Sequence, residues 1–277
     1  MQRERLTDDI YVFTSELYAQ VTAGVVVTSV GAVVIDTLVY PEETRAIKRF
    51  VETRLNTRVK YVINTHFHAD HTTGTCFFEA ATVLGHVRCR ELLDKRGRES
   101  LERAKSSAQE LQEVELVLPQ IVFDQGTLTM HIGGKTLHLW ATPGHSPDSI
   151  VCHVKEDNVL FAGDTIMPIP YFVDGSYDDF YASLESLRSS SFEHIVQGHG
   201  EIILRGEIEE KLESDIEYLL KLRQALDNLK EFTPAALESI DIERCGKSRI
   251  LLNGTVQQLH RQNVLALAAQ RREPQLS

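Results

Sequence analysis

The heptapeptide Thr65-His66-Phe67-His68-Ala69-Asp70-His71 places three imidazoles and one carboxylate within six residues. Alternate side chains of an extended segment share one side, so His66 and His68 point the same way. Asp70 and His71 follow at the next turn. Neutral imidazole and carboxylate are the usual protein ligands of Zn²⁺ and of non-haem iron. The heptapeptide therefore predicts a site for two metal ions, or for one ion with the remaining groups around it.

Further candidate ligands stand where a short apolar run gives way to a turn that contains glycine. His145 follows Pro143-Gly144, Asp164 follows Ala162-Gly163, and His199 follows Gly198. Asp36, at the end of an apolar β-branched run, has the same kind of position. A rigid strand aims such a side chain, and glycine lets the backbone approach closely. We therefore expect several strand ends to converge at one edge of a sheet.

The order of these motifs, HxHxDH followed by a lone histidine, a strand-ending aspartate and a final Gly-His pair, resembles the metallo-β-lactamase-fold hydrolase superfamily. All five superfamily motifs match in order over residues 31 to 200. The resemblance implies two metal sites, a carboxylate that bridges them and a buried acid that orients the ligand loop. The first site would use His66, His68 and His145, and the second Asp70, His71 and His199, with Asp164 as the bridge and Asp36 as the buried acid.

The resemblance implies a metal-dependent hydrolase. Two Zn²⁺ ions, or iron or manganese in their place, would hold a bridging hydroxide that attacks an ester, lactone or thioester carbonyl. Asp70 would serve as a ligand and as the catalytic group that orients the water and moves its proton. Two alternatives stay open, a mononuclear iron enzyme similar to persulfide dioxygenases and a phosphodiesterase of the same fold. A non-catalytic interaction module is disfavoured, because all seven ligands are present.

Departures from the known branches of this superfamily limit the classes of substrate that we expect. Dedicated β-lactamases of this fold usually have Cys or Ser where this chain has Asp164. Glyoxalase II enzymes usually follow the lone histidine with a second Gly-His, whereas Ser146-Pro147-Asp148 follows His145 here. Quorum-sensing lactonases usually have a tyrosine where this chain has Met167. The pattern favours the glyoxalase II and lactonase-like branch, acting on a small molecule, but does not name the scissile bond.

The segment from Ile166 to Tyr177 directly follows the predicted bridging aspartate and mixes proline, aromatic and acidic residues. We expect it to line an apolar substrate pocket over the metals, in the manner of a lid. The residues predicted to line this pocket are Met167, Tyr171, Phe172 and Tyr177.

The pattern of elements predicts an α+β fold, a four-layer αββα sandwich with a C-terminal helical extension. Residues 1–205 would form the catalytic domain and residues 206–277 the extension packed on it. Predicted helices cover 41–55, 88–115 with a break near Gly97, 178–189, 207–229, 234 onward and 253–271, and short apolar strands lie between the helices up to residue 197.

Composition excludes several classes of partner. The chain has 29 basic and 40 acidic residues and a formal charge of −11, which argues against a nucleic-acid surface. No apolar run is long enough for a membrane span, and the N-terminus lacks a hydrophobic signal core. We therefore expect a cytoplasmic protein that binds neither nucleic acid nor membrane. A homodimer formed through the apolar stripe of the C-terminal helices is an open alternative.

Overall fold

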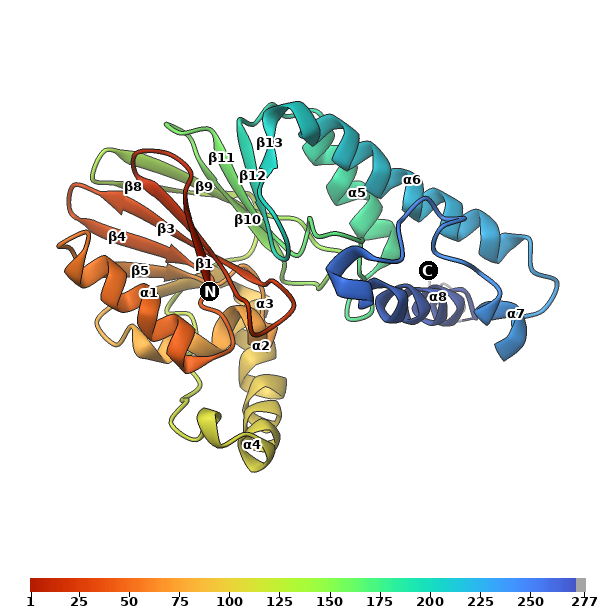
Figure 1. Ribbon diagram of the computed structural model, residues 1–277, viewed down its shortest axis with the longest axis horizontal. Helices are drawn as coiled ribbons and strands as arrows, with labels where there is room; N and C mark the ends of the chain where they lie inside the picture. The colour runs from red at the N-terminus through yellow and green to blue at the C-terminus, as the bar shows by residue number, and fades with distance from the viewer. Residues whose placement is uncertain (273–277) are drawn as a thin grey trace.

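Runs rich in valine and isoleucine form the first of two β-sheets in the computed structural model, which describes residues 1–272 (Figure 1). Its strands lie in the order β1-β2-β3-β4-β5-β6-β7. Pairing is antiparallel from β1 to β4 and parallel from β4 to β7. The strands are β1 (Gln2–Arg5), β2 (Ile10–Thr14), β3 (Thr22–Thr28), β4 (Gly31–Ile35), β5 (Val59–Ile63), β6 (Thr82–His86) and β7 (Ile121–Phe123).

The second sheet has the strand order β13-β12-β11-β10-β9-β8. Its pairs are antiparallel except β11 and β12, which run parallel. The bridge between Val21 and His199 links the two sheets beside the predicted site. The strands are β8 (Thr127–Ile132), β9 (Lys135–Ala141), β10 (Ile150–Val154), β11 (Val159–Gly163), β12 (His194–Gln197) and β13 (Ile203–Leu204).

Apolar side chains from the facing sheets fill the space between them. Ile35 and Ile63 of the first sheet belong to the same buried cluster as Leu139 and Phe161 of the second. Gly24 in β3 is required here, because a Cβ at this position would lie 2.1 Å from the Phe161 ring. This packing fixes the two sheets against each other, and so fixes the relative positions of the strand ends that carry the candidate ligands.

Helices cover both outer faces and complete the predicted αββα sandwich (Figure 1). Pro41 begins α1, whose buried Ile47 and Val51 pack on the first sheet, as their spacing predicts. The second sheet is covered from the other side by α5, α6 and α8, which share one buried cluster with it. The helices are α1 (Pro41–Thr53), α2 (Ala69–Thr72), α3 (Val87–Leu92), α4 (Arg98–Ser107), α5 (Tyr177–Arg188), α6 (Ile208–Asp227), α7 (Pro234–Glu238) and α8 (Val256–Arg272).

The C-terminal helices continue the helical layer on the α5 side of the sandwich, where Figure 1 shows them extending away from the sheets. Leu212 and Leu219 of α6 and Val264 of α8 lie in the same buried cluster as strand residues of the second sheet. The domain boundary between residues 205 and 206 stays a prediction. Over residues 1–272, no helix is long and apolar enough to cross a membrane.

The segment between β6 and β7 differs from the prediction at Gly97. The expected break is wrong, because Gly97 has helical angles of φ −62° and ψ −39°. The chain passes from α3 through a π-helical turn over Leu93–Gly97 directly into α4. A wider π-helical turn therefore takes the place of the helix break that the glycine led us to expect. The resulting arm projects from the sandwich below α2 and α3 in Figure 1.

Candidate metal centre

The seven candidate ligands meet at one edge of the sandwich, where four strands end. The heptapeptide around His66 follows β5, and the His145 loop joins β9 to β10. Asp164 follows β11 directly, and His199 follows β12 after Gly198. The side chains form two groups, and within each group the ligand atoms all lie within 4.8 Å of one another. The members are His66, His68, His145 and Asp164 in the first group and Asp70, His71 and His199 in the second.

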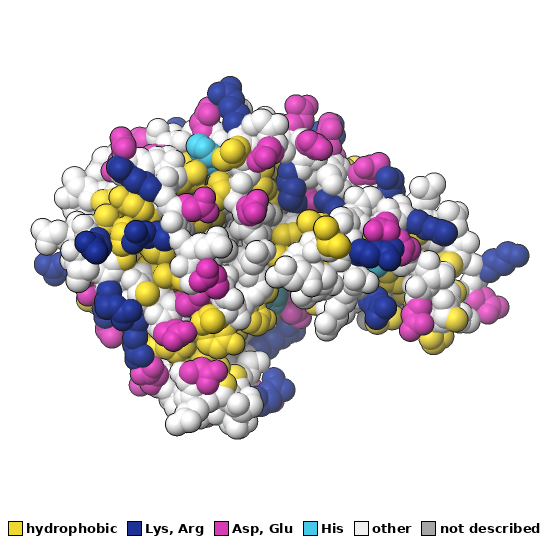
Figure 2. Space-filling view, in the orientation of Figure 1, with side chains coloured by type: hydrophobic (Ala, Val, Ile, Leu, Met, Phe, Trp, Pro, Cys, Tyr) yellow, Lys and Arg dark blue, Asp and Glu magenta, His cyan; other side chains and the backbone are white. Residues whose placement is uncertain are grey.

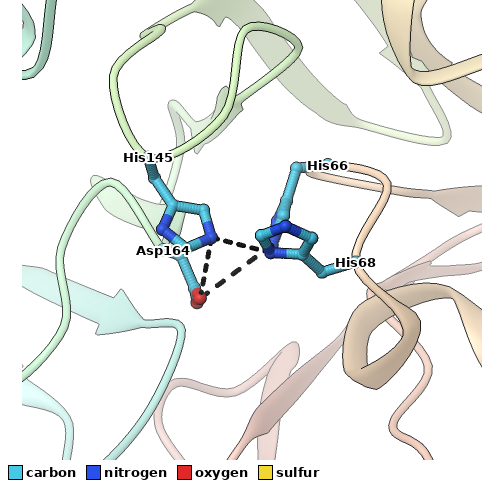
Figure 3. A group of neighbouring side chains, drawn as sticks. All are labelled: His66, His68, His145 and Asp164. Atoms are coloured by element: carbon cyan, nitrogen blue, oxygen red, sulfur yellow. Dashed lines mark hydrogen bonds and ion pairs between the residues drawn. The ribbon is translucent and has the colours of Figure 1, made fainter. Parts of the chain in front are cut away.

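Three histidines and one aspartate of the first group point toward a common centre (Figure 3). His68 Nδ1 lies 3.1 Å from His66 Nε2 and 2.9 Å from His145 Nε2. Asp164 Oδ2 lies 3.3 Å from His145 Nε2 and 3.9 Å from His66 Nε2. Four ligand atoms at these distances surround a space of the size that a single metal ion needs.

Asp164 also reaches the second group. Its Oδ1 lies 3.2 Å from His71 Nε2, and its Oδ2 lies 3.4 Å from His199 Nε2. Asp70 Oδ2 lies 3.4 Å from the same His199 nitrogen and 3.8 Å from His71 Nε2. Gly198 permits this approach, because a Cβ there would lie 1.9 Å from Asp164 Oδ1. The geometry of Asp164 is therefore that of a carboxylate between two sites.

Hydrogen bonds on the outer side of the imidazole rings fix which nitrogen carries the proton. His145 Nδ1 donates to the Tyr171 carbonyl at 2.7 Å, and His199 Nδ1 donates to the Ala19 carbonyl at 2.9 Å. His68 Nε2 donates to Asp174 Oδ2 at 3.0 Å. In each ring the opposite nitrogen faces the centre, where it can bind a proton or a metal ion.

Asp36 organises the remaining two rings. Its carboxylate accepts hydrogen bonds from the Thr65 backbone at 2.8 Å and the Thr65 hydroxyl at 2.7 Å. It also accepts a hydrogen bond from His71 Nδ1 at 2.8 Å. The Thr65 oxygen lies 3.1 Å from His66 Nδ1, so it can accept that proton. Asp36 has the left-handed φ of 57°, which aspartate adopts more readily than most residues.

Burial and neighbouring charges shift the pKa values of the two ligand groups in different ways. Burial lowers the pKa of His66 well below its ordinary value and that of His145 to about 4, which keeps both rings neutral. Burial also opposes a charge on His199, but Asp164 and Asp70 raise its pKa to about 10. Burial would raise the pKa of Asp70, yet His71 and His199 lower it to about 2. The second group therefore attracts positive charge strongly.

The donor set fits two divalent cations. His71 Nε2 and Asp164 Oδ1 are buried and accept or donate no hydrogen bond, although they face each other. A ring nitrogen and a carboxylate oxygen that face each other at 3.2 Å repel unless a proton or a cation lies between them. Imidazole and carboxylate are ligands that zinc, iron and manganese all accept. The residues present can thus hold two metal ions that share Asp164.

Two residues beside the site were not singled out from the sequence. Asp174, the outer partner of His68, lies within the 166–177 segment. Acidic residues are so common in loops that its presence there does not indicate a role in the site. Tyr18 lies on the β2–β3 loop and lines a cavity beside His68. The negative charge of Asp70, and then burial, raise the pKa of Tyr18, which keeps its hydroxyl protonated. No local pattern in the sequence marks Tyr18.

The segment predicted to line the substrate pocket turns inward instead. Phe172 and Tyr177 lie in the buried cluster beneath α5, α6 and α8, and Met167 is also buried. Tyr171 is only partly buried, but its hydroxyl donates to Gln262 of α8 at 2.8 Å. None of the four is among the residues that line the cavity beside the site. The segment is anchored to α8, so it is not built as a free lid.

Two sheets between helical layers, with a histidine and aspartate cluster at the strand ends, define a metal-binding αββα protein. The family model described as the metallo-beta-lactamase superfamily matches residues 18–225. The chain belongs to this superfamily.

Individual relatives are more distant. The chain is 28% identical over 177 residues to "Beta-lactamase-like protein 2 homolog" of Caenorhabditis elegans, covering 64% of this chain and 54% of the relative. It is 26% identical over 164 residues to "Thioesterase pkgB" of Emericella nidulans, covering 59% and 41%. The chain thus spans about half the length of these relatives or less. The structure of a metallo-beta-lactamase from Pontibacter korlensis matches with a TM-score of 0.66 and 20% identity, covering 79% of this chain and 98% of that one.

Proposed function

We propose that this protein is a metal-dependent hydrolase that binds two zinc ions and cleaves a thioester, ester or lactone of a small molecule. The arrangement of imidazole protons carries the proposal. His68, His71, His145 and His199 each donate one ring hydrogen to an outer acceptor. Rings held in this way turn their other nitrogen toward one centre, which is how proteins orient histidines for metal ions.

The metal ligands in this proposal are His66, His68 and His145 on one side, Asp70, His71 and His199 on the other, and Asp164 between them. Bound zinc ions would supply Lewis acidity, which lowers the pKa of a coordinated water and polarises a carbonyl oxygen. Asp36 keeps His71 and the Thr65 backbone in place through its three hydrogen bonds. The ligands and Asp36 position the metal ions, whereas contact with water and substrate is made by groups that solvent can reach.

Asp70 is placed to orient a water molecule at the site by accepting a hydrogen bond from it. Its side chain is 16% exposed, more than the other second-group ligands, and its Oδ2 lies 3.4 Å from His199 Nε2. A pKa of about 2 keeps it ionised at neutral pH. Tyr18 remains protonated at the mouth of the site and can donate a hydrogen bond to a substrate oxygen. No serine or cysteine nucleophile is needed.

A thioester is our first choice of scissile bond, because the relative in Emericella nidulans is named a thioesterase. Only part of that protein aligns with this chain, so esters and lactones stay in the proposal. We also retain the prediction of a cytoplasmic location. A homodimer is a further prediction.

The test uses protein stripped with a chelator and reloaded with zinc, iron or manganese. We expect the zinc form to hydrolyse at least one member of a panel of thioesters, esters and lactones, and the stripped form to be inactive. Asp70→Asn should lower kcat by about 100-fold or more, in the range expected for a positioned acid–base group. Cleavage of bis(4-nitrophenyl) phosphate alone would identify a phosphodiesterase. Oxygen uptake by the iron form with a persulfide would identify an oxygenase, and either result overturns the proposal.

A further inference from the structure

A cavity of about 580 Å³ separates the α4 arm from the sandwich. It opens beside His68 of the metal centre and beside Asp174. Figure 2 shows hydrophobic side chains gathered where this arm meets the sandwich. A volume of this size lies in the range that small-molecule sites occupy.

Apolar side chains form a large part of the wall of this cavity. Leu101 and Ala104 face it from α4, and Leu111 closes it from the following turn. Phe67 and Val39 form the wall on the sandwich side. Ala104 lies where a larger residue would fill the space, so the hollow depends on a short side chain.

Both arginines of the lining face acids, and the lining contains two further glutamates. Arg96 Nη1 lies 3.6 Å from Asp174 Oδ1, and Arg103 Nη1 lies 3.8 Å from Glu99 Oε1. Both guanidinium groups are more than half exposed, so they lie at the rim rather than in the interior. A ligand anion would have to compete with these carboxylates. The interior therefore favours an uncharged hydrocarbon chain.

We propose that this cavity binds an apolar hydrocarbon chain that is attached to the scissile carbonyl group of the substrate. The inference rests on the proposed hydrolase function and adds the substrate class. Because His68 lies at the cavity mouth, a carbonyl group beside the metal centre would direct one of its two substituents under α4. The chain can belong to the acyl group or to the leaving group.

Two substrate series distinguish these sources. One series is S-acyl-N-acetylcysteamine from acetyl to decanoyl, and the other is the S-alkyl thioacetates from methyl to octyl. Release of thiol reports on both. In the series whose chain enters the cavity, we expect kcat/KM to rise by about threefold to fourfold per methylene, then level off when the cavity is full. No rise in either series, with hydrolysis intact, would overturn the inference but not the hydrolase function.

Ala104→Trp tests the location, and Ser106→Trp on the outer side of the same helix is its matched control. Ser106 is exposed and does not line the cavity. We expect Ala104→Trp to abolish the increase of kcat/KM with chain length. Ser106→Trp should retain the full increase. Equal chain-length dependence in the two variants would show that the chain binds elsewhere.

A binding measurement separates failure of the cavity from failure of the proposed function. The uncharged fluorescent probe N-phenyl-1-naphthylamine is titrated into chelator-treated protein and displaced with 1-decanol. We expect binding to the wild type and to Ser106→Trp, and at least tenfold weaker binding to Ala104→Trp. This result would support the cavity even if no thioester, ester or lactone were hydrolysed. Absence of binding to the wild type would contradict it.

Discussion

Asp36 shows how one buried carboxylate can control several ligands. It is 3% exposed and accepts three hydrogen bonds, two from Thr65 and one from His71. The resemblance to the superfamily predicts this role, and Asp36 ends an apolar strand in the same way as the ligands do. Its influence should fall mainly on the second group, through His71.

We predict that Asp36→Asn weakens zinc binding at one of the two sites by about 10-fold to 100-fold, as is usual for outer partners of metal ligands. An amide has one acceptor oxygen fewer, so the Thr65 hydrogens and the His71 hydrogen cannot all be accepted. Competition with a chromophoric chelator measures the change. Asp178→Asn, at an exposed position, is the control. Equal zinc affinities in Asp36→Asn and the wild type would refute this role.

Asp174→Asn should act on the other group, because its partner is His68. The neighbouring His68, more than any other residue, lowers the pKa of Asp174, which keeps it ionised. We predict about a tenfold loss of zinc affinity at one site and little change at the site that Asp36→Asn weakens. The same chelator competition reads out both sites. A loss confined to the site that Asp36→Asn weakens would contradict this pairing of Asp174 with the first group.

At the scale of elements, the strands and their glycine turns could be predicted from the sequence, because β-branched runs and Gly198 are local signals. Three features could not. The edge strand β1 is polar and exposed throughout, so it has no hydrophobic alternation. Phe172 is predicted to line the substrate pocket. Its position is instead fixed by contacts distant in sequence, since its backbone amide donates to Asn263, which is 91 residues away. The cavity under α4 depends on the position of the arm that carries this helix. The spacing of apolar residues in the sequence does not predict that position.

The α6 helix is tied to the loop after Asp164 by a buried lysine. Lys211 Nζ donates to the Met167 carbonyl at 2.7 Å and also pairs with Asp215. Asp215 is paired in turn with Lys247 at 2.7 Å. Burial lowers the pKa of Lys211 to about 8 from 10.5. The unfolded chain therefore binds more protons at this residue between pH 8 and 10.5.

Because the folded pKa is the lower one, the contribution of Lys211 to the free energy of unfolding rises with pH in that window. We predict that wild type gains about 1 kcal/mol relative to Lys211→Met between pH 7 and pH 9. Urea denaturation at several pH values measures the difference. Lys221→Met, at a more exposed position of the same helix, should show no such gain. A constant difference between wild type and Lys211→Met would contradict the lowered pKa.

At the scale of the whole molecule, the metal centre joins parts that pack separately. The cluster between the sheets and the clusters on their outer faces each supply strand ends to the same edge. Three carboxylates, Asp36, Asp70 and Asp164, gather around His71 there. Cations at this edge should therefore stabilise the entire fold.

We predict that zinc raises the midpoint of thermal unfolding by about 5 °C or more at concentrations far above Kd, since a ligand that binds only the folded chain stabilises it by mass action. Differential scanning calorimetry of stripped and reloaded protein measures this. His199→Ala should reduce the shift, and Ser106→Trp should not. An unchanged midpoint on reloading would mean that zinc does not bind the folded site.

Metal stoichiometry tests the central claim most directly. Elemental mass spectrometry on protein purified without chelators, and again after zinc reloading and desalting, counts the ions per chain. The arrangement of two ligand groups that share Asp164 predicts about two zinc ions per chain, falling to about one in His199→Ala. One iron per folded chain that zinc cannot replace, or no retained metal at all, would contradict the two-metal account.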